Sequence, residues 1–131
     1  MLRSIVAVVA GLAITVVLVI GLGFLAAAVT GVPPGGPPTP GYLVLNLLGA
    51  LASGAVGGAI AVSLAPHTPR GHVIALALVI LLLSLPTLFS PPAAGQPTWY
   101  GLALSVIGPV SVAAGGYTAI RRREGTSPTS A

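Results

Sequence analysis

The sequence predicts an all-α fold, a polytopic bundle of four transmembrane helices that forms a single membrane domain over residues 1–124. Of 131 residues, 55% are hydrophobic and only 5% are charged, whereas soluble domains carry about 25% charged residues. Four apolar stretches reach the roughly 17 residues that a helix needs to cross a bilayer. The lipid bilayer is therefore the expected partner of most of the surface. The net charge of +4 is better explained by membrane topology than by a nucleic-acid partner.

The first span is expected over residues 4–29, because residues 5–25 contain no charged side chain. As a helix it would cover roughly 37 Å, more than the ~30 Å hydrocarbon core, so it is expected to tilt. The alternative is a cleaved signal peptide, since Arg3 precedes an apolar run that ends in three alanines. This run exceeds the about 7–15 apolar residues of a signal peptide, which favours a retained helix. Small residues form a line along the span: Ala7, Gly11 and Thr15.

The second span, residues 42–64, follows a connection over residues 31–41 that consists largely of Pro and Gly, which disfavour helix. Small residues recur in this span at every fourth position, with Gly57 beside them: Ala50, Gly54 and Gly58. In lipid, small residues at this spacing let two helix backbones approach closely, so packing replaces the missing hydrophobic drive. This span is expected to be the centre of helix packing.

The third span, residues 73–89, is the shortest and consists mostly of Ala, Leu, Ile and Val. Pro86 is expected to bend or end it, because proline lacks the backbone donor that a helix interior needs. A short turn over residues 66–72 precedes this span, and a second Pro-rich loop over residues 90–98 follows it. The turn contains both histidines of the chain, which are expected to be solvated or interfacial.

The fourth span covers residues 99–120, and three consecutive arginines follow it directly. With four spans, these arginines, Arg3 and Arg70 fall on one side of the membrane, while both Pro-rich loops fall on the other side without any charge. Positive residues stay in the cytoplasm, so both termini are expected inside, in a protein of the cell (inner) membrane. Residues 125–131 are mostly polar and are expected to form a disordered tail.

The second and fourth spans resemble each other when Tyr42 is set against Tyr100 without gaps. The matched positions include two glycine pairs, Gly57 with Gly115 and Gly58 with Gly116. Each half would then be a hairpin in the same orientation, which gives a parallel repeat about an axis along the membrane normal. The alternative is coincidence, because low-complexity apolar sequences match one another easily. The two tyrosines, together with Trp99, are expected in an aromatic belt at the outer interface.

The spans contain no Asp, Glu, Lys, Arg or His, which argues against an ion-coupled transporter or proton relay in a single chain. The chain also has no Cys, no pair of acidic residues and no Gly-Lys-Ser/Thr phosphate loop. We therefore expect no enzymatic activity, no catalytic residue, no cofactor and no metal site.

Three intramembrane positions are candidates for a polar site or cavity. Asn46 is the most polar, and it is expected either to contact a solute or, as the favoured alternative, to make an interhelical hydrogen bond worth about 1 kcal/mol or less. Ser105 lies one turn before Pro109, which removes the helical partner of the Ser105 carbonyl. Such breaks line a site in some transporters but more often only kink the helix.

Two short motifs mark the ends of spans: Gly57-Gly58-Ala59-Ile60-Ala61 closes the second, and Gln96-Pro97-Thr98-Trp99-Tyr100 opens the fourth. With these motifs and this layout, the chain resembles small four-span bacterial inner-membrane proteins of unassigned function. The resemblance implies a four-helix fold but no reaction, ligand or site residue. The chain differs from the small multidrug exporters, whose first span needs an acidic residue.

Two classes of function are compatible with these patterns. The leading hypothesis is a non-enzymatic accessory or structural subunit, which packs with itself or with a larger membrane-protein complex through its glycine faces. The competing hypothesis is a small oligomeric channel or transporter for a neutral or lipid-like solute, with Asn46 and Pro109 along the path and a cavity that both Asn46 and Ser105 reach. The expected helix-packing residues are Gly54, Gly57, Gly58, Gly115 and Gly116.

Overall fold

The computed structural model describes residues 2–92 and 94–125, and within them the regular structure is entirely helical. Each helix is long and apolar enough to cross a membrane, since even the shortest, with 21 residues, covers about 32 Å. The four helices are α1 (Leu2–Thr30), α2 (Pro40–Leu64), α3 (Pro69–Phe89) and α4 (Thr98–Gly125). The prediction of an all-α, four-helix membrane bundle is confirmed.

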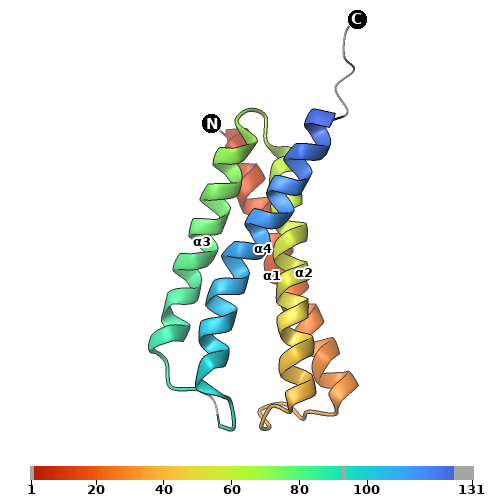
Figure 1. Cartoon of the computed structure of the whole chain (residues 1–131), viewed down its shortest axis with the longest axis vertical. Helices are drawn as coiled ribbons and strands as arrows, with labels where there is room; N and C mark the ends of the chain where they lie inside the picture. Colours follow the sequence, from red (N-terminus) through yellow and green to blue (C-terminus); the bar gives the residue numbers. More distant parts are fainter. Residues whose placement is uncertain (1, 93, 126–131) are drawn as a thin grey trace, which may run out of the picture.

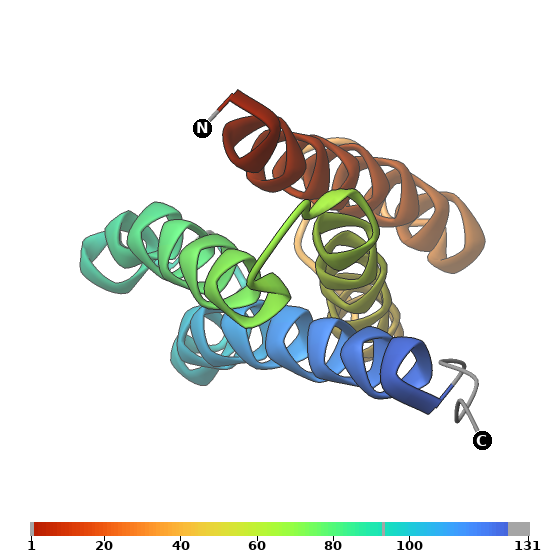
Figure 2. The ribbon, with the colours of Figure 1, turned by 90° about the horizontal axis from the view of Figure 1, so that it is seen from above.

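The helices form two hairpins, α1–α2 and α3–α4, that run in the same direction (Figure 1). The start of α1, the α2–α3 turn and the end of α4 lie together at what we call the terminal end, and both Pro-rich loops lie at the opposite, loop end. Seen from above, α2 lies between α1 and α4, and α3 lies beside α4 (Figure 2). In the described part of the chain, α1 and α4 do not contact each other. Helices α2 and α4 are therefore the centre of the bundle.

Proline at the first helical position starts two of the helices, where its missing N–H costs no hydrogen bond. At the start of α2, the Thr39 hydroxyl caps the helix by accepting a hydrogen bond from the Tyr42 backbone N–H at 3.3 Å. Helix α3 begins at Pro69, four residues before the predicted start, so Arg70 and His72 belong to the helix. The prediction of a turn over residues 66–72 was too long for this reason.

Helix α3 ends where the sequence predicts, and α4 ends later than predicted. Helix α3 continues through Pro86 and ends at Phe89. Helix α4 continues past residue 120 to Gly125, because the polar residues after the span have no proline that would stop it before residue 128. The prediction that Gly125 belongs to a disordered tail is therefore wrong, and residues 126–131 lie outside the described residues.

The two clusters of buried apolar side chains lie in the terminal half of the bundle. One cluster joins three helices through Ala61, Leu76 and Val112, and a second joins them through Val62, Val73 and Ile120. By contrast, large apolar side chains on the outer faces of α1 and α3 are exposed, such as Phe24 and Phe89. In a lipid solvent such exposure is the expected state of the outer surface. The interior is therefore held together by these two apolar clusters and by the small residues between the helices.

The parallel orientation of the hairpins agrees with a parallel repeat, but the aligned glycines do not make equivalent contacts. Gly57 of α2 faces α1, the first helix of its own hairpin, whereas the aligned Gly115 of α4 faces α2. Gly58 faces α4, whereas the aligned Gly116 faces α3. Neighbouring residues on a helix point about 100° apart, so the two helices are rotated differently relative to their hairpin partners. The ungapped alignment therefore does not describe the contacts of the two halves.

Candidate functional site

Gly54, Gly58 and Gly115 lie in the interface between α2 and α4. A methyl group on Gly58 would overlap the Val112 carbonyl oxygen and lie 3.0 Å from the Gly116 backbone nitrogen. A methyl group on Gly115 would similarly run into the backbone of Ala55. Because these neighbours are backbone atoms, no side-chain rotation would relieve the overlap. The small residues therefore set the distance between the two central helices.

The two remaining predicted packing glycines contact the outer helices. A methyl group on Gly57 would lie 2.7 Å from the Gly11 carbonyl oxygen of α1 and overlap the Thr15 hydroxyl. Thr15 itself donates a hydrogen bond to the Gly11 carbonyl at 2.8 Å, so its polar group is satisfied within α1. Gly116 lies against Val73 of α3. All five predicted packing glycines thus contact helices of the same chain.

At the loop end, the polar contact between α2 and α4 joins Asn46 and Tyr100. The Asn46 side-chain amide donates a hydrogen bond to the Tyr100 hydroxyl, which is the interhelical bond favoured for Asn46. Tyr100 is only 3% exposed, so it does not face lipid in an aromatic belt as expected. Its neighbour Trp99 is 52% exposed, and the two rings pack edge to face with centroids 5.9 Å apart.

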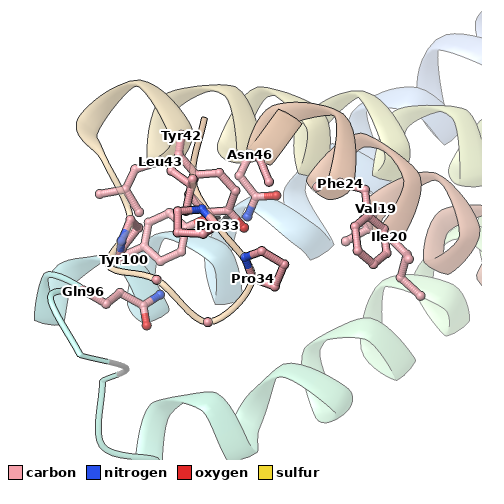
Figure 3. Close-up of a pocket in the computed structure, with 16 residues that line it drawn as sticks. Val19, Ile20, Phe24, Pro33, Pro34, Tyr42, Leu43, Asn46, Gln96 and Tyr100 are labelled. Carbon is pink, nitrogen blue, oxygen red and sulfur yellow. Dashed lines mark hydrogen bonds between the residues drawn. The ribbon is translucent and has the colours of Figure 1, made fainter. Parts of the chain in front are cut away.

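Asn46 and Tyr100 also line a pocket of about 490 Å³ at the loop end (Figure 3). Its walls come from the second half of α1, the first turns of α2, the Pro-rich loop between them and the start of α4. The loop is shaped by a turn in which the Gly36 N–H donates to the Pro33 carbonyl at 2.9 Å. Gly35 takes a φ of +74° there, which glycine adopts without strain.

Ser105 and Pro109 do not line this pocket. Ser105 donates to the Gly101 carbonyl of its own helix at 2.9 Å and lies 3.1 Å from the Thr87 hydroxyl of α3. Pro109 lies within α4, which continues on both sides of it. The structure therefore does not bring Asn46 and Ser105 to one shared cavity at this end.

The terminal end carries the charged residues. Arg70 of α3 and Glu124 of α4 form an ion pair of 3.8 Å between two largely exposed side chains. His67 is exposed, but His72 is buried and its Nδ1 lies 3.1 Å from the Thr68 carbonyl. The expectation of a solvated or interfacial His72 is therefore wrong, because α3 begins early enough to turn this side chain inward.

Of the residues that line the loop-end pocket, only Asn46 was a sequence-based candidate, and two of the others, Tyr100 and Gly23, lie next to its side chain. The sequence predicts Tyr100 in an aromatic belt at the outer interface, because tyrosine is typical of interfaces, and nothing local indicates that it meets a residue 54 positions earlier. Gly23 lies where a methyl group would come within 3.3 Å of Asn46 Oδ1. A small residue of α1 that faces Asn46 could have indicated this site. The sequence does not show which face of α1 points toward Asn46, so Gly23 could not be recognised.

Comparisons with protein-family models, with curated proteins and with solved structures found no match to this chain. The geometry described above is therefore the basis for any functional conclusion. Four apolar helices of sufficient length identify the chain as a multi-pass membrane protein whose outer surface contacts lipid.

Proposed function

We propose that this protein is a non-enzymatic accessory subunit of a membrane-protein complex, and that it acts by packing against a transmembrane helix of a different polypeptide. The observation that carries the proposal is a shallow groove of about 510 Å³ between α2 and α4. Its lining consists mainly of small residues, among them Ala55, Ala59, Ala114 and Thr118. Small residues on an open face allow another helix backbone to approach closely in lipid.

This groove replaces the glycine faces as the proposed contact surface. Gly54, Gly57, Gly58 and Gly116 are buried against helices of the same chain, so a partner helix cannot reach them. The groove includes only Gly115 of the five glycines, and it is open to a partner because Val56 is 43% exposed and Ala114 is also exposed.

Charge favours a different polypeptide over a second copy of this chain. Arg122 is among the residues that line the groove and gives it a positive charge, which an acidic partner surface would complement. The chain has five arginines and a single acid, Glu124, which pairs with Arg70. A second copy therefore has no other carboxylate side chain to offer.

The proposed orientation places the terminal end in the cytoplasm of a cell with a bacterial-type inner membrane. All five arginines belong to the starts of α1 and α3 or to the last turns of α4, which supports cytoplasmic termini because positive residues are retained on that side. The loop end, with its uncharged Pro-rich segments, would then face outward.

The test is isolation of the tagged protein from its native membranes in mild detergent or nanodiscs, followed by mass determination. Ala114→Leu fills the groove, and Ala13→Leu makes the same change at an exposed position of α1 outside it. We expect a stoichiometric partner with the unmodified protein and with Ala13→Leu, and its loss with Ala114→Leu. A bare monomer, a homo-oligomer or equal effects of both variants would contradict the proposal.

The channel or transporter hypothesis has weaker support. It requires a cavity that Asn46 and Ser105 both reach, and the loop-end pocket is lined by Asn46 but not by Ser105 or Pro109. Because the pocket lies at one end of the bundle and does not reach Ser105 or Pro109, its position favours binding of a molecule over transport across the membrane. A flux of neutral solutes through reconstituted vesicles would restore the transport hypothesis.

A further inference from the structure

The loop-end pocket is large enough for one small amphiphilic molecule, and its polar and apolar lining residues lie on different sides. Its volume of about 490 Å³ lies within the roughly 300–1,000 Å³ typical of ligand pockets. Figure 3 shows Asn46, Tyr42, Gln96 and Tyr100 gathered on one side and Phe24 with its α1 neighbours on the other. The pocket therefore has a polar end and an apolar end.

The polar end retains unused hydrogen-bonding capacity. The Tyr100 hydroxyl accepts from the Asn46 amide, and within the described residues neither the Tyr100 O–H nor Asn46 Oδ1 has a further partner among the hydrogen bonds of the chain. An asparagine side chain offers two N–H donors and a carbonyl acceptor, and a tyrosine hydroxyl both donates and accepts. The Asn46 amide lies close to Gly23 of α1, where a methyl group would come within 3.3 Å of Oδ1. The absence of a side chain at Gly23 therefore leaves room for the amide. This end can bind hydroxyl or carbonyl oxygens.

The apolar end is continuous with the lipid-exposed surface of α1. Val19, Ile20 and Phe24 line the pocket and are 36%, 54% and 75% exposed. A hydrocarbon chain along these side chains would remain in contact with the bilayer. A lipid could therefore enter the pocket from the membrane without passing through water.

None of the described residues that line the pocket carries a charged side chain. A phosphate or carboxylate brought to the polar end would lose solvation without gaining a cation, which is costly. An uncharged head with hydroxyl or ester groups meets no such penalty, because its oxygens can pair with Asn46 and Tyr100.

We propose that the loop-end pocket binds an uncharged, single-chain lipid taken from the surrounding bilayer, with the head group at Asn46 and Tyr100 and the tail along α1. The binding site is separate from the groove between α2 and α4. The inference therefore does not depend on the proposed partner helix.

The test uses the full chain in nanodiscs with a photoreactive monoacylglycerol as the probe. After irradiation, we expect the label on peptides of α1 and α2 that contain Phe24 and Asn46, with displacement by excess monooleoylglycerol but not by phosphatidylglycerol. Label spread evenly over the exposed faces of α1 and α3 would overturn the proposal, and so would equal displacement by the anionic lipid.

Variants separate specific binding from general contact with lipid. Asn46→Leu and Tyr100→Phe each remove polar groups at the head site and should reduce labelling roughly fivefold. Phe24→Ala should also reduce it, whereas Phe89→Ala should not, because Phe89 is 85% exposed on the other hairpin and lies outside the pocket. Thermal unfolding of each variant identifies any loss of folding, and Tyr100→Phe preserves the buried ring. Unchanged labelling in folded Asn46→Leu and Tyr100→Phe would refute the head-group assignment, and equal effects of the two Phe variants would refute the tail assignment.

Discussion

Gly58→Ala is the substitution with the clearest expected cost, because one methyl group would meet backbone atoms of the neighbouring helix. The added carbon would overlap the Val112 carbonyl oxygen and lie 3.0 Å from the Gly116 nitrogen. Neither neighbour can rotate away, so α2 and α4 must separate over their shared length, which also opens the contacts of Gly54 and Gly115. Overpacking of this kind costs about 1–3 kcal/mol. We expect a value toward the upper limit, and a larger loss for Gly58→Leu.

The matched control is Gly21→Ala in α1, where a methyl group would meet nothing within 4 Å. Replacing glycine with alanine in a helix favours folding by about 1 kcal/mol at either position. The difference between the unfolding free energies of the two variants therefore isolates the steric cost. We therefore expect Gly21→Ala to be slightly more stable than the unmodified protein, and Gly58→Ala to be about 1–3 kcal/mol less stable than Gly21→Ala.

The assay is unfolding in mixed micelles with increasing denaturing detergent, followed by the fluorescence of the single tryptophan, Trp99. Trp99 packs against Tyr100 of α4, which contacts α2, so separation of the two central helices should change its emission. Equal unfolding free energies for Gly58→Ala and Gly21→Ala would refute the inference that glycine sets the α2–α4 distance.

Three smaller predictions follow from the same geometry. Asn46→Leu removes one interhelical hydrogen bond and should lower the unfolding free energy by about 1 kcal/mol or less in the same assay; a loss of several kcal/mol would mean that the bond is central to folding. Glu124→Gln breaks the exposed pair with Arg70 and should change stability by less than about 1 kcal/mol, even at low salt. Because the chain has no cysteine, His67→Cys and Ala94→Cys can each be labelled with an impermeant thiol reagent on intact cells, and we expect only Ala94→Cys to react.

Local composition was sufficient to predict the four helices and the parallel orientation of the hairpins. The spans were predicted because their apolar residues are contiguous in sequence, and the Pro-rich connections interrupt them. Helix ends were less predictable. The early start of α3 at Pro69 and the extension of α4 to Gly125 occur in polar residues, where hydropathy no longer distinguishes helix from turn. The burial of His72 follows from that early start.

The small-residue spacing indicated which residues pack closely but not which helices they contact. Gly57 and Gly58 are adjacent in sequence, yet one faces α1 and the other faces α4. A helix turns about 100° per residue, so the rotation of α2 relative to its neighbours decides these contacts. That rotation depends on all the side chains packed around α2 at once.

Local composition alone is sufficient to predict four apolar spans without a charged side chain, because both properties can be read from neighbouring residues of the chain. Three further features depend on how the helices are arranged: the five glycines contact helices of their own chain, Asn46 meets Tyr100, and these two residues line a pocket at the loop end. The physical reason is that the residues of each contact come from different helices, and their meeting depends on how the helices rotate and pack rather than on the hydrophobicity of any one of them.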